Sequence, residues 1–149
     1  MDNLIEEIQI RLHAQGGRMT SQRRLIMETL SEMGSHPTAE EIFTLAREKD
    51  PSLHLSTVYR TLRWLEQEGL VHSRFFDDER RQERFDPAPE KEHYHFFCTE
   101  CKRVIEFDTL LVNAIKAQFE LHTGAEVEIG SVVLYGLCAV CREKQPVPA

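Results

Sequence analysis

The sequence lacks the features of a secreted, membrane-bound or DNA-coating protein. Acidic residues outnumber Lys and Arg by 25 to 18, and a net charge of -7 argues against indiscriminate coating of nucleic acid. No apolar run approaches the roughly 18 residues that span a bilayer, so we expect a soluble protein without membrane contact. The opening residues Met-Asp-Asn-Leu-Ile-Glu-Glu contain neither the basic stretch nor the apolar core of a secretory signal. We therefore expect a cytoplasmic protein in a reducing compartment.

Cysteine is also scarce, but its placement is informative. All four cysteines fall into two Cys-x-x-Cys pairs, Cys98 with Cys101 and Cys138 with Cys141. A reducing compartment disfavours two disulfides, and the paired spacing makes unrelated buried thiols the weaker interpretation. Four thiolates are the soft ligand set of a closed tetrahedral zinc site. We therefore predict a structural Zn²⁺ held by the two pairs.

The first part of the chain predicts helices followed by a β-hairpin. Helical spacing of apolar residues, capping signals at Thr20, Thr38 and Ser56, and glycine stop signals define the helices. The expected elements are helices at about 4–12, 21–33, 39–49 and 57–68, then strands at 70–76 and 80–85 around a turn at 77–79. The last three of these helices, with the hairpin after them, follow the order of a winged helix, whose last helix meets DNA.

The helix after Ser56 has two different faces. Val58, Leu62 and Leu65 share one side of the helical wheel. The opposite side carries hydrogen-bond donors, an aromatic ring and two guanidinium groups, from Ser56, Tyr59, Arg60, Arg63 and Gln67. Such a face suits contact with base edges and phosphates, although an ordinary solvated face fits this helix equally well. Basic residues on the hairpin suit a wing near phosphate, namely Arg74, Arg80, Arg81 and Arg84. The acidic residues Asp77, Asp78, Glu79 and Glu83 could equally balance them, so this pattern assigns no individual wing contact.

Two prolines in the polar run 86–90 predict a stiff linker between two domains. The expected fold class is α+β, with a winged-helix DNA-binding domain at 1–84, a hinge at 85–92 and a small α/β dimerisation and metal-binding domain at 93–149. In the second domain the pattern predicts strands at 93–97, 103–107 and 126–135 and a helix from Asp108 to Gly124 with one apolar side. Because this domain is small, we expect zinc and association to stabilise it.

A second group of metal ligands adjoins the first cysteine pair. His93 and His95 alternate along a strand, so both side chains leave one face, and Glu106 lies on the neighbouring strand. Asp86 in the linker and His36 from the first domain complete a set of nitrogen and oxygen ligands. This set suits Fe(II), Mn(II), Co(II), Ni(II) or Zn(II), although any single histidine is more often a surface or hydrogen-bonded residue.

Several motifs together resemble the ferric uptake regulator family over nearly the whole chain. They are Arg18-Met19-Thr20-Ser21-Gln22-Arg23, His36-Pro37-Thr38-Ala39-Glu40-Glu41, Ser56-Thr57-Val58-Tyr59-Arg60-Thr61-Leu62, Arg84-Phe85-Asp86, the run from His93 to Cys101 and Tyr135-Gly136-Leu137-Cys138-Ala139-Val140-Cys141. The resemblance implies a cytoplasmic bacterial homodimer that represses genes of metal-ion homeostasis by binding operator DNA when loaded with metal.

The resemblance also implies roles for individual residues. The structural zinc falls to the four cysteines, and the regulatory ion falls to His36, Asp86, His93, His95 and Glu106. Fe²⁺ is the expected regulatory ion, with Mn²⁺ and Zn²⁺ as alternatives. The helix with Ser56, Thr57, Tyr59 and Arg60 is expected in the major groove, and Arg18 in a minor groove.

Two departures from the family pattern bear on function. Members with a third metal site have histidines where this chain has Glu92 and Gly130, so we expect no third site. The peroxide-sensing branch has aspartate at the position of Glu106, and the glutamate favours metal sensing over iron-catalysed histidine oxidation. A peroxide-sensing or a zinc- or manganese-sensing regulator remains the alternative within the family.

Two other classes of protein compete with a repressor. Two histidines with a carboxylate also describe an open mononuclear metalloenzyme site. Nothing in the sequence resembles a nucleophile elbow, a phosphate loop or a general acid and base pair, so we expect neither an enzyme nor a small organic substrate. A zinc-stabilised protein-interaction module is the third interpretation, and it predicts no operator affinity with any metal.

Overall fold

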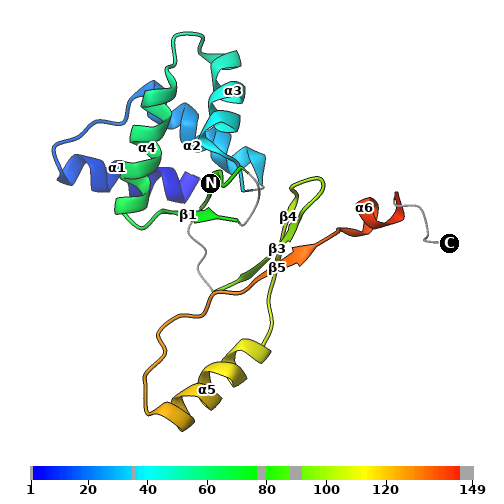
Figure 1. Cartoon of the computed structure of the whole chain (residues 1–149). Helices are drawn as coiled ribbons and strands as arrows, with labels where there is room; N and C mark the ends of the chain where they lie inside the picture. The colour runs from blue at the N-terminus through cyan, green and yellow to red at the C-terminus, as the bar shows by residue number, and fades with distance from the viewer. Residues whose placement is uncertain (1, 35, 77–79, 88–91, 145–149) are drawn as a thin grey trace. The chain divides into compact units, whose positions relative to one another are not determined.

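The chain divides into two compact units, residues 1–88 and 89–149 (Figure 1). This computed structural model describes residues 2–34, 36–76, 80–87 and 92–144. The expected turn at 77–79 and the linker residues 88–90 lie outside the described residues. Helices and strands occur in both units, which confirms the α+β class, and each unit is described by itself.

The first unit is a winged helix, as predicted. Its helices are α1 (Asp2–Ala14), α2 (Ser21–Met33), α3 (Ala39–Lys49) and α4 (Leu55–Gln67). They are followed by an antiparallel hairpin of β1 (Val71–Phe75) and β2 (Glu83–Pro87) (Figure 1). Along the chain, α4 is therefore followed directly by the two strands of the wing.

Local capping chemistry sets most of the helix ends. The Thr20 hydroxyl accepts a hydrogen bond from the Arg23 N–H at the start of α2, and Gly34 ends that helix with φ of 57°. Thr38 and Glu41 form the predicted capping box of α3. The predicted Ser56 cap of α4 is wrong, because the first helical hydrogen bonds run to the carbonyl of His54 and place Ser56 inside the first turn.

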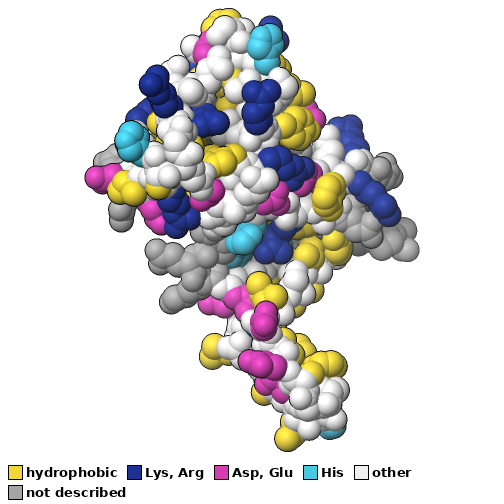
Figure 2. All heavy atoms as spheres, turned by 90° about the vertical axis from the view of Figure 1, so that its left-hand side faces the viewer, with side chains coloured by type: hydrophobic (Ala, Val, Ile, Leu, Met, Phe, Trp, Pro, Cys, Tyr) yellow, Lys and Arg dark blue, Asp and Glu magenta, His cyan; other side chains and the backbone are white. Residues whose placement is uncertain are grey.

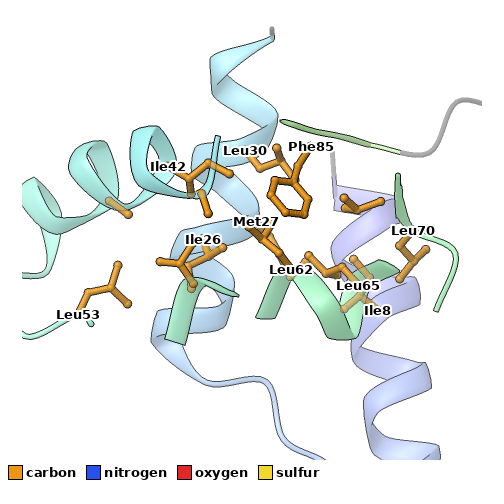
Figure 3. Close-up of a cluster of buried hydrophobic side chains, with 14 of the residues drawn as sticks. Ile8, Ile26, Met27, Leu30, Ile42, Leu53, Leu62, Leu65, Leu70 and Phe85 are labelled. Carbon is orange, nitrogen blue, oxygen red and sulfur yellow. The ribbon is translucent and has the colours of Figure 1, made fainter. Parts of the chain in front are cut away.

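The core of the first unit joins the helices to the wing. Figure 3 shows apolar side chains from α1, α2, α3 and α4 meeting in one cluster. Phe85 of β2 points into this cluster and is fully buried. Burying a side chain of this size contributes about 1.5–3 kcal/mol, so Phe85 anchors the second strand of the hairpin to the helices.

The strand β2 lies further along the chain than predicted. It covers Glu83–Pro87 instead of residues 80–85, and Asp86 pairs with His72 in the antiparallel register. Pro87, expected in the linker, pairs with Val71 at the end of the strand. Proline is acceptable there because β2 has one neighbouring strand in its sheet, so the missing N–H breaks no second ladder.

The second unit is built on a three-stranded sheet of order β4-β3-β5. Its elements are β3 (Tyr94–Cys98), β4 (Val104–Phe107), α5 (Leu111–Thr123), β5 (Val133–Gly136) and α6 (Ala139–Glu143). The central β3 pairs antiparallel with β4 and parallel with β5. This topology brings the end of β3 beside the residues that precede α6, so the two cysteine pairs meet at one end of the sheet.

Two boundaries in the second unit differ from the prediction. Asp108 does not cap α5, whose N-cap residue is Leu110, and the Thr109 hydroxyl accepts from the Leu111 N–H instead. The final strand begins at Val133, not at residue 126. In the preceding segment the Val127 N–H donates to the Glu120 carboxylate, so side chains satisfy backbone groups that the prediction gave to a strand.

Most side chains of the helix α5 are exposed or only partly buried. Val112 is its buried residue, whereas Leu111, Ile115 and Phe119 are each more than half exposed. Figure 2 shows apolar side chains at the surface in the lower part of that view. In the described part of the chain, no helix combines the length and the apolar character needed to cross a bilayer.

Candidate metal centres and nucleic-acid interface

The four cysteines meet at one end of the sheet in the second unit. Their sulfur atoms lie within 4.8 Å of one another, and the Sγ atoms of Cys101 and Cys138 are 3.7 Å apart. Four thiolates at about 2.3 Å from a tetrahedral zinc are separated by about 3.8 Å, so this spacing fits the ion. All four are free thiols in the described structure.

The backbone around these cysteines prepares Cys98 to act as a thiolate. Burial alone raises the pKa of Cys98, but N–H groups of Cys138, Cys101 and Glu100 donate to its sulfur and lower the pKa to about 6. Burial and the neighbouring thiols Cys138, Cys101 and Cys98 have the opposite effect on Cys141 and raise its pKa. Four thiols packed this closely cannot all ionise without a cation, so the cluster has the electrostatic character of a site for a divalent ion such as zinc.

Two of the predicted nitrogen and oxygen ligands lie together in the first unit. His36 precedes α3, and Asp86 lies on β2, with 3.2 Å between His36 Nε2 and Asp86 Oδ2. The aromatic ring of Phe76 lies edge-on to the His36 imidazole, with 6.1 Å between the ring centroids. An imidazole and a carboxylate at this distance form half of a site for a borderline divalent ion.

Arg84 does not act as the exposed wing cation that its charge suggested. Its side chain is buried, and Nη1 donates to the carbonyl oxygen of His36 at 2.9 Å. The Phe85 N–H donates to the carbonyl of Pro37, and Arg84 forms an isolated β-bridge with Thr38. Arg84 therefore fixes the backbone of His36 beside the strand that carries Asp86.

The other three predicted ligands lie together in the second unit. His95 on β3 stands opposite Glu106 on β4 in the antiparallel register. His93 lies just before β3, with 3.4 Å between its Nε2 atom and Glu106 Oε1 and 4.7 Å between the ring centroids of His93 and His95. This half-site offers two imidazoles and one carboxylate.

Glu92 and Gly130, which stand where relatives with a third metal site have histidines, lie at an ion pair. Lys116 Nζ on α5 lies 2.9 and 2.5 Å from the two carboxylate oxygens of Glu92. The Gly130 N–H and the Tyr94 hydroxyl donate to the same carboxylate. Hydrogen bonding to Lys116 lowers the pKa of Glu92. The Lys116 ammonium is therefore the cation paired with Glu92 among the described residues.

Three of the predicted DNA-contacting residues line an open groove in the first unit. This groove lies where α2 and α4 begin, and its lining includes Arg18, Thr57 and Arg60. The sequence interpretation missed Arg23 and Ser52, which also line it. Figure 2 shows several Lys and Arg side chains on one face of the upper part of the molecule. Guanidinium groups beside helix N-termini favour phosphate.

Ser56 and Tyr59 lie on α4 outside that groove. Ser56 is exposed, whereas Tyr59 is half-buried and its hydroxyl donates to Glu40 Oε1 on α3 at 2.8 Å. The hydrogen bond to Glu40 raises the pKa of Tyr59. Tyr59 is thus held against α3 by a contact that the helical wheel could not reveal.

Known proteins resemble this chain over both units. The model of the ferric uptake regulator family matches residues 14–135. The peroxide-responsive repressor PerR of Staphylococcus epidermidis is 31% identical over 144 residues, covering 97% of this chain and 94% of the relative. The peroxide operon regulator of Bacillus subtilis is 32% identical over 130 residues, covering 87% and 88%.

Solved structures extend the likeness. The Helicobacter pylori ferric uptake regulator aligns with a TM-score of 0.87 over 97% of this chain and 95% of that chain, and its identity of 23% is a likeness of fold. A zinc-bound manganese uptake regulator is 30% identical with a TM-score of 0.71, covering 85% of this chain and 95% of that one. The matches therefore span residues of both units, and the names of the relatives differ in what they say each protein responds to.

Proposed function

Because the chain belongs to the ferric uptake regulator family of DNA-binding transcriptional regulators, we propose that it is a metal-dependent repressor that binds operator DNA as a homodimer. Residues 1–84 bind DNA, residues 85–92 act as a hinge, and residues 93–149 carry dimerisation and metal binding. The protein acts in the cytoplasm on genes of metal-ion homeostasis. It is a regulator, as its relatives are, and turns over no small organic substrate.

The structural ion of the proposed repressor is Zn²⁺. Cys98, Cys101, Cys138 and Cys141 are the ligands, which is supported by sulfur spacing that fits a tetrahedral ion. The first pair comes from the last residue of β3 and the turn after it, and the second pair comes from the N-cap and the first turn of α6. Zinc therefore ties the end of the sheet to the C-terminal helix of the unit.

The regulatory ion takes ligands from both units. His36 and Asp86 contribute from the first unit, and His93, His95 and Glu106 contribute from the second. The observation that carries this proposal is that each unit gathers its own ligands: His36 lies 3.2 Å from Asp86, and His93 lies 3.4 Å from Glu106 with the His95 ring beside it. A divalent ion bound by ligands of both units at once would restrict the hinge. The restricted hinge favours one spacing of the two α4 helices in the dimer.

The DNA-binding surface is the groove at the start of α2 and α4 with the adjacent face of α4. Arg60, Ser56, Thr57 and Tyr59 enter the major groove, and Arg18 reaches a minor groove. The exposure of Arg18 and Arg60 and their shared groove support this assignment. The local positive charge is needed because the whole chain is acidic.

The homodimer forms through the second unit. The apolar side chains of α5, with Leu134 and Tyr135 of β5, are exposed to an extent that a monomer rarely shows in one small unit. A second copy of the unit would cover them. Dimerisation then presents two α4 helices to two half-sites of a palindromic operator.

A metal titration tests the proposal. The zinc-loaded protein is mixed anaerobically with a palindromic A/T-rich DNA fragment, and anisotropy is followed as buffered Fe²⁺, Mn²⁺ or Zn²⁺ is added. We expect Fe²⁺ to induce binding, and His36→Ala to abolish the response while His13→Ala, an exposed histidine of the same unit, retains it. If no metal changes DNA affinity, the regulatory site is wrong.

Peroxide sensing is the second candidate function, because two relatives at 31% and 32% identity are named as peroxide-responsive regulators. The Fe²⁺-loaded protein is treated with hydrogen peroxide, with the Mn²⁺-loaded protein as control. A plain metal sensor keeps its histidines unmodified and its DNA affinity intact. Gain of one oxygen atom on the peptide containing His93 and His95, with release of DNA, would instead establish peroxide sensing.

A further inference from the structure

Arg63 on α4 is held by the wing. Its Nη1 donates to Glu83 Oε1 at 2.8 Å, and its Nη2 donates to the other oxygen of the same carboxylate. Glu83 is the first residue of β2. The two parallel bonds fix both the distance and the plane of the pair, as bidentate guanidinium pairs do. The α4 helix is therefore joined to the second strand of the hairpin by a directional contact.

A second carboxylate joins the same helix to the first strand. Glu66, one turn after Arg63, accepts a hydrogen bond from Arg63 Nη1 at 2.8 Å and another from the Ser73 hydroxyl on β1. The guanidinium carbon of Arg63 also lies 5.7 Å from the ring centroid of Phe85, the core residue of β2. Arg63, Glu66, Ser73 and Glu83 form one cluster across α4, β1 and β2, which we call the wing clamp.

The wing clamp explains why Arg63 is unsuited to contact DNA phosphate. The Glu83 side chain is only 14% exposed, so withdrawal of Arg63 would leave a mostly buried carboxylate without its cation. One guanidinium between two carboxylates leaves the cluster with net negative charge. Phosphates are thus disfavoured in the C-terminal half of α4, beside Glu66 and Glu83, and favoured in its N-terminal half, where Arg60 lies.

We propose that the wing clamp positions the hairpin against α4, so that Arg63 and Glu83 determine operator affinity without touching DNA. The inference rests on the proposed DNA-binding function and assigns Arg63 and Glu83 as positioning residues. With the clamp closed, the wing and the N-terminal half of α4 meet the duplex as one rigid surface. With the clamp open, Phe85 still anchors β2, but α4 no longer holds Glu83 and Ser73. The strands near these two residues must then be ordered when DNA binds, which lowers affinity.

The substitution Glu83→Gln separates this role from simple charge. Removal of an acidic residue from a DNA-binding unit reduces repulsion, so charge alone predicts equal or tighter binding. Loss of the clamp predicts weaker operator binding, by about tenfold, with the salt dependence of binding unchanged because no phosphate contact is lost. The matched control is Glu48→Gln, an exposed carboxylate on α3, which follows the charge expectation.

Two further variants keep the test decisive. Arg63→Lys retains the charge but cannot make the bidentate pair, so it should weaken binding as much as Glu83→Gln does; a phosphate contact would survive this change. The exchange Arg63→Glu with Glu83→Arg keeps the net charge and restores a cation between two carboxylates, so it should recover most of the affinity. Faster hydrogen exchange of the β1 and β2 amides in Glu83→Gln, with α2 unchanged, is the accompanying structural signature.

The outcomes separate the two proposals. If the metal-loaded wild-type protein binds no operator fragment, the proposed function fails and the exchange data alone report on the clamp. If the wild type binds, and Glu83→Gln binds equally well or more tightly, the wing clamp has no positioning role.

Discussion

Loss of the structural zinc should unfold the second unit and leave the first unit folded. Among the described residues, one core cluster of the first unit contains fifteen buried apolar residues, whereas the cluster at the cysteine end of the second unit contains Cys98, Cys138 and Cys141. Structural zinc contributes an apparent binding free energy of about 10–16 kcal/mol at pH 7, which is as large as the whole stability of many domains. We therefore expect Cys98→Ser to remove zinc and to abolish stable folding of the unit.

Hydrogen exchange read by mass spectrometry measures the two units separately. In Cys98→Ser the amides of β3 and β5 should exchange at rates close to those of an unfolded chain, while the amides of α2 and α4 stay protected. Thr99→Ser, in the same turn, keeps all four thiols and should match the wild type. A zinc-free Cys98→Ser protein in which β3 and β5 remain protected would refute the role given to zinc.

Three further predictions concern the dimer, the regulatory site and pH. Phe119→Asp should raise the dimer dissociation constant at least about 100-fold by sedimentation, because a symmetric interface loses two apolar side chains; unchanged mass rules out α5. Arg84→Met should weaken binding of the regulatory metal about tenfold, measured by calorimetry, and leave zinc binding unchanged, because Arg84 holds the backbone of His36 through its carbonyl oxygen. Equal metal affinity in the variant refutes this. Hydrogen bonds from Ser73 and Arg63 hold the pKa of Glu66 below its ordinary 4.5. Their contribution to the free energy of unfolding is therefore present above pH 4.5 and is lost as the pH falls through the lowered pKa. In a plot of the free energy of unfolding against pH, Glu66→Gln should flatten this acidic part.

Local chemistry made many helix ends predictable from the sequence. The capping box of Thr38 and Glu41 and the glycines at 34 and 124 act within one turn of chain, so the sequence contains the whole cause. The position of β2 depends on a distant cause, because burial of Phe85 among the helices fixes which residues pair with β1. A hairpin pattern by itself leaves that register open.

The positions of the candidate ligands were more predictable than the contacts of the residues around them. Alternation along one strand was enough to place His95 beside a neighbouring strand with Glu106. Nothing in the charge pattern distinguishes Arg84, which is buried against the His36 carbonyl, from an exposed wing arginine. Arg63 likewise looked like a free cation on the helical wheel, because Glu83 lies far along the sequence and becomes its partner only in the folded unit.

The division of the proposed regulatory ligands between two units has a thermodynamic consequence. Two ligands in the first unit, or three in the second, leave a divalent ion with water in its remaining positions, so either share alone binds weakly. Metal binding can restrict the hinge only by the difference in free energy between binding to the complete ligand set and binding to the ligands of one unit. To move the hinge from 1% to 99% in the DNA-binding arrangement, that difference must be about 10⁴-fold, or about 5.5 kcal/mol. Substitution of Asp86 by Asn should therefore reduce metal affinity and metal-induced DNA binding together, whereas a change in the wing clamp should reduce DNA binding at unchanged metal affinity.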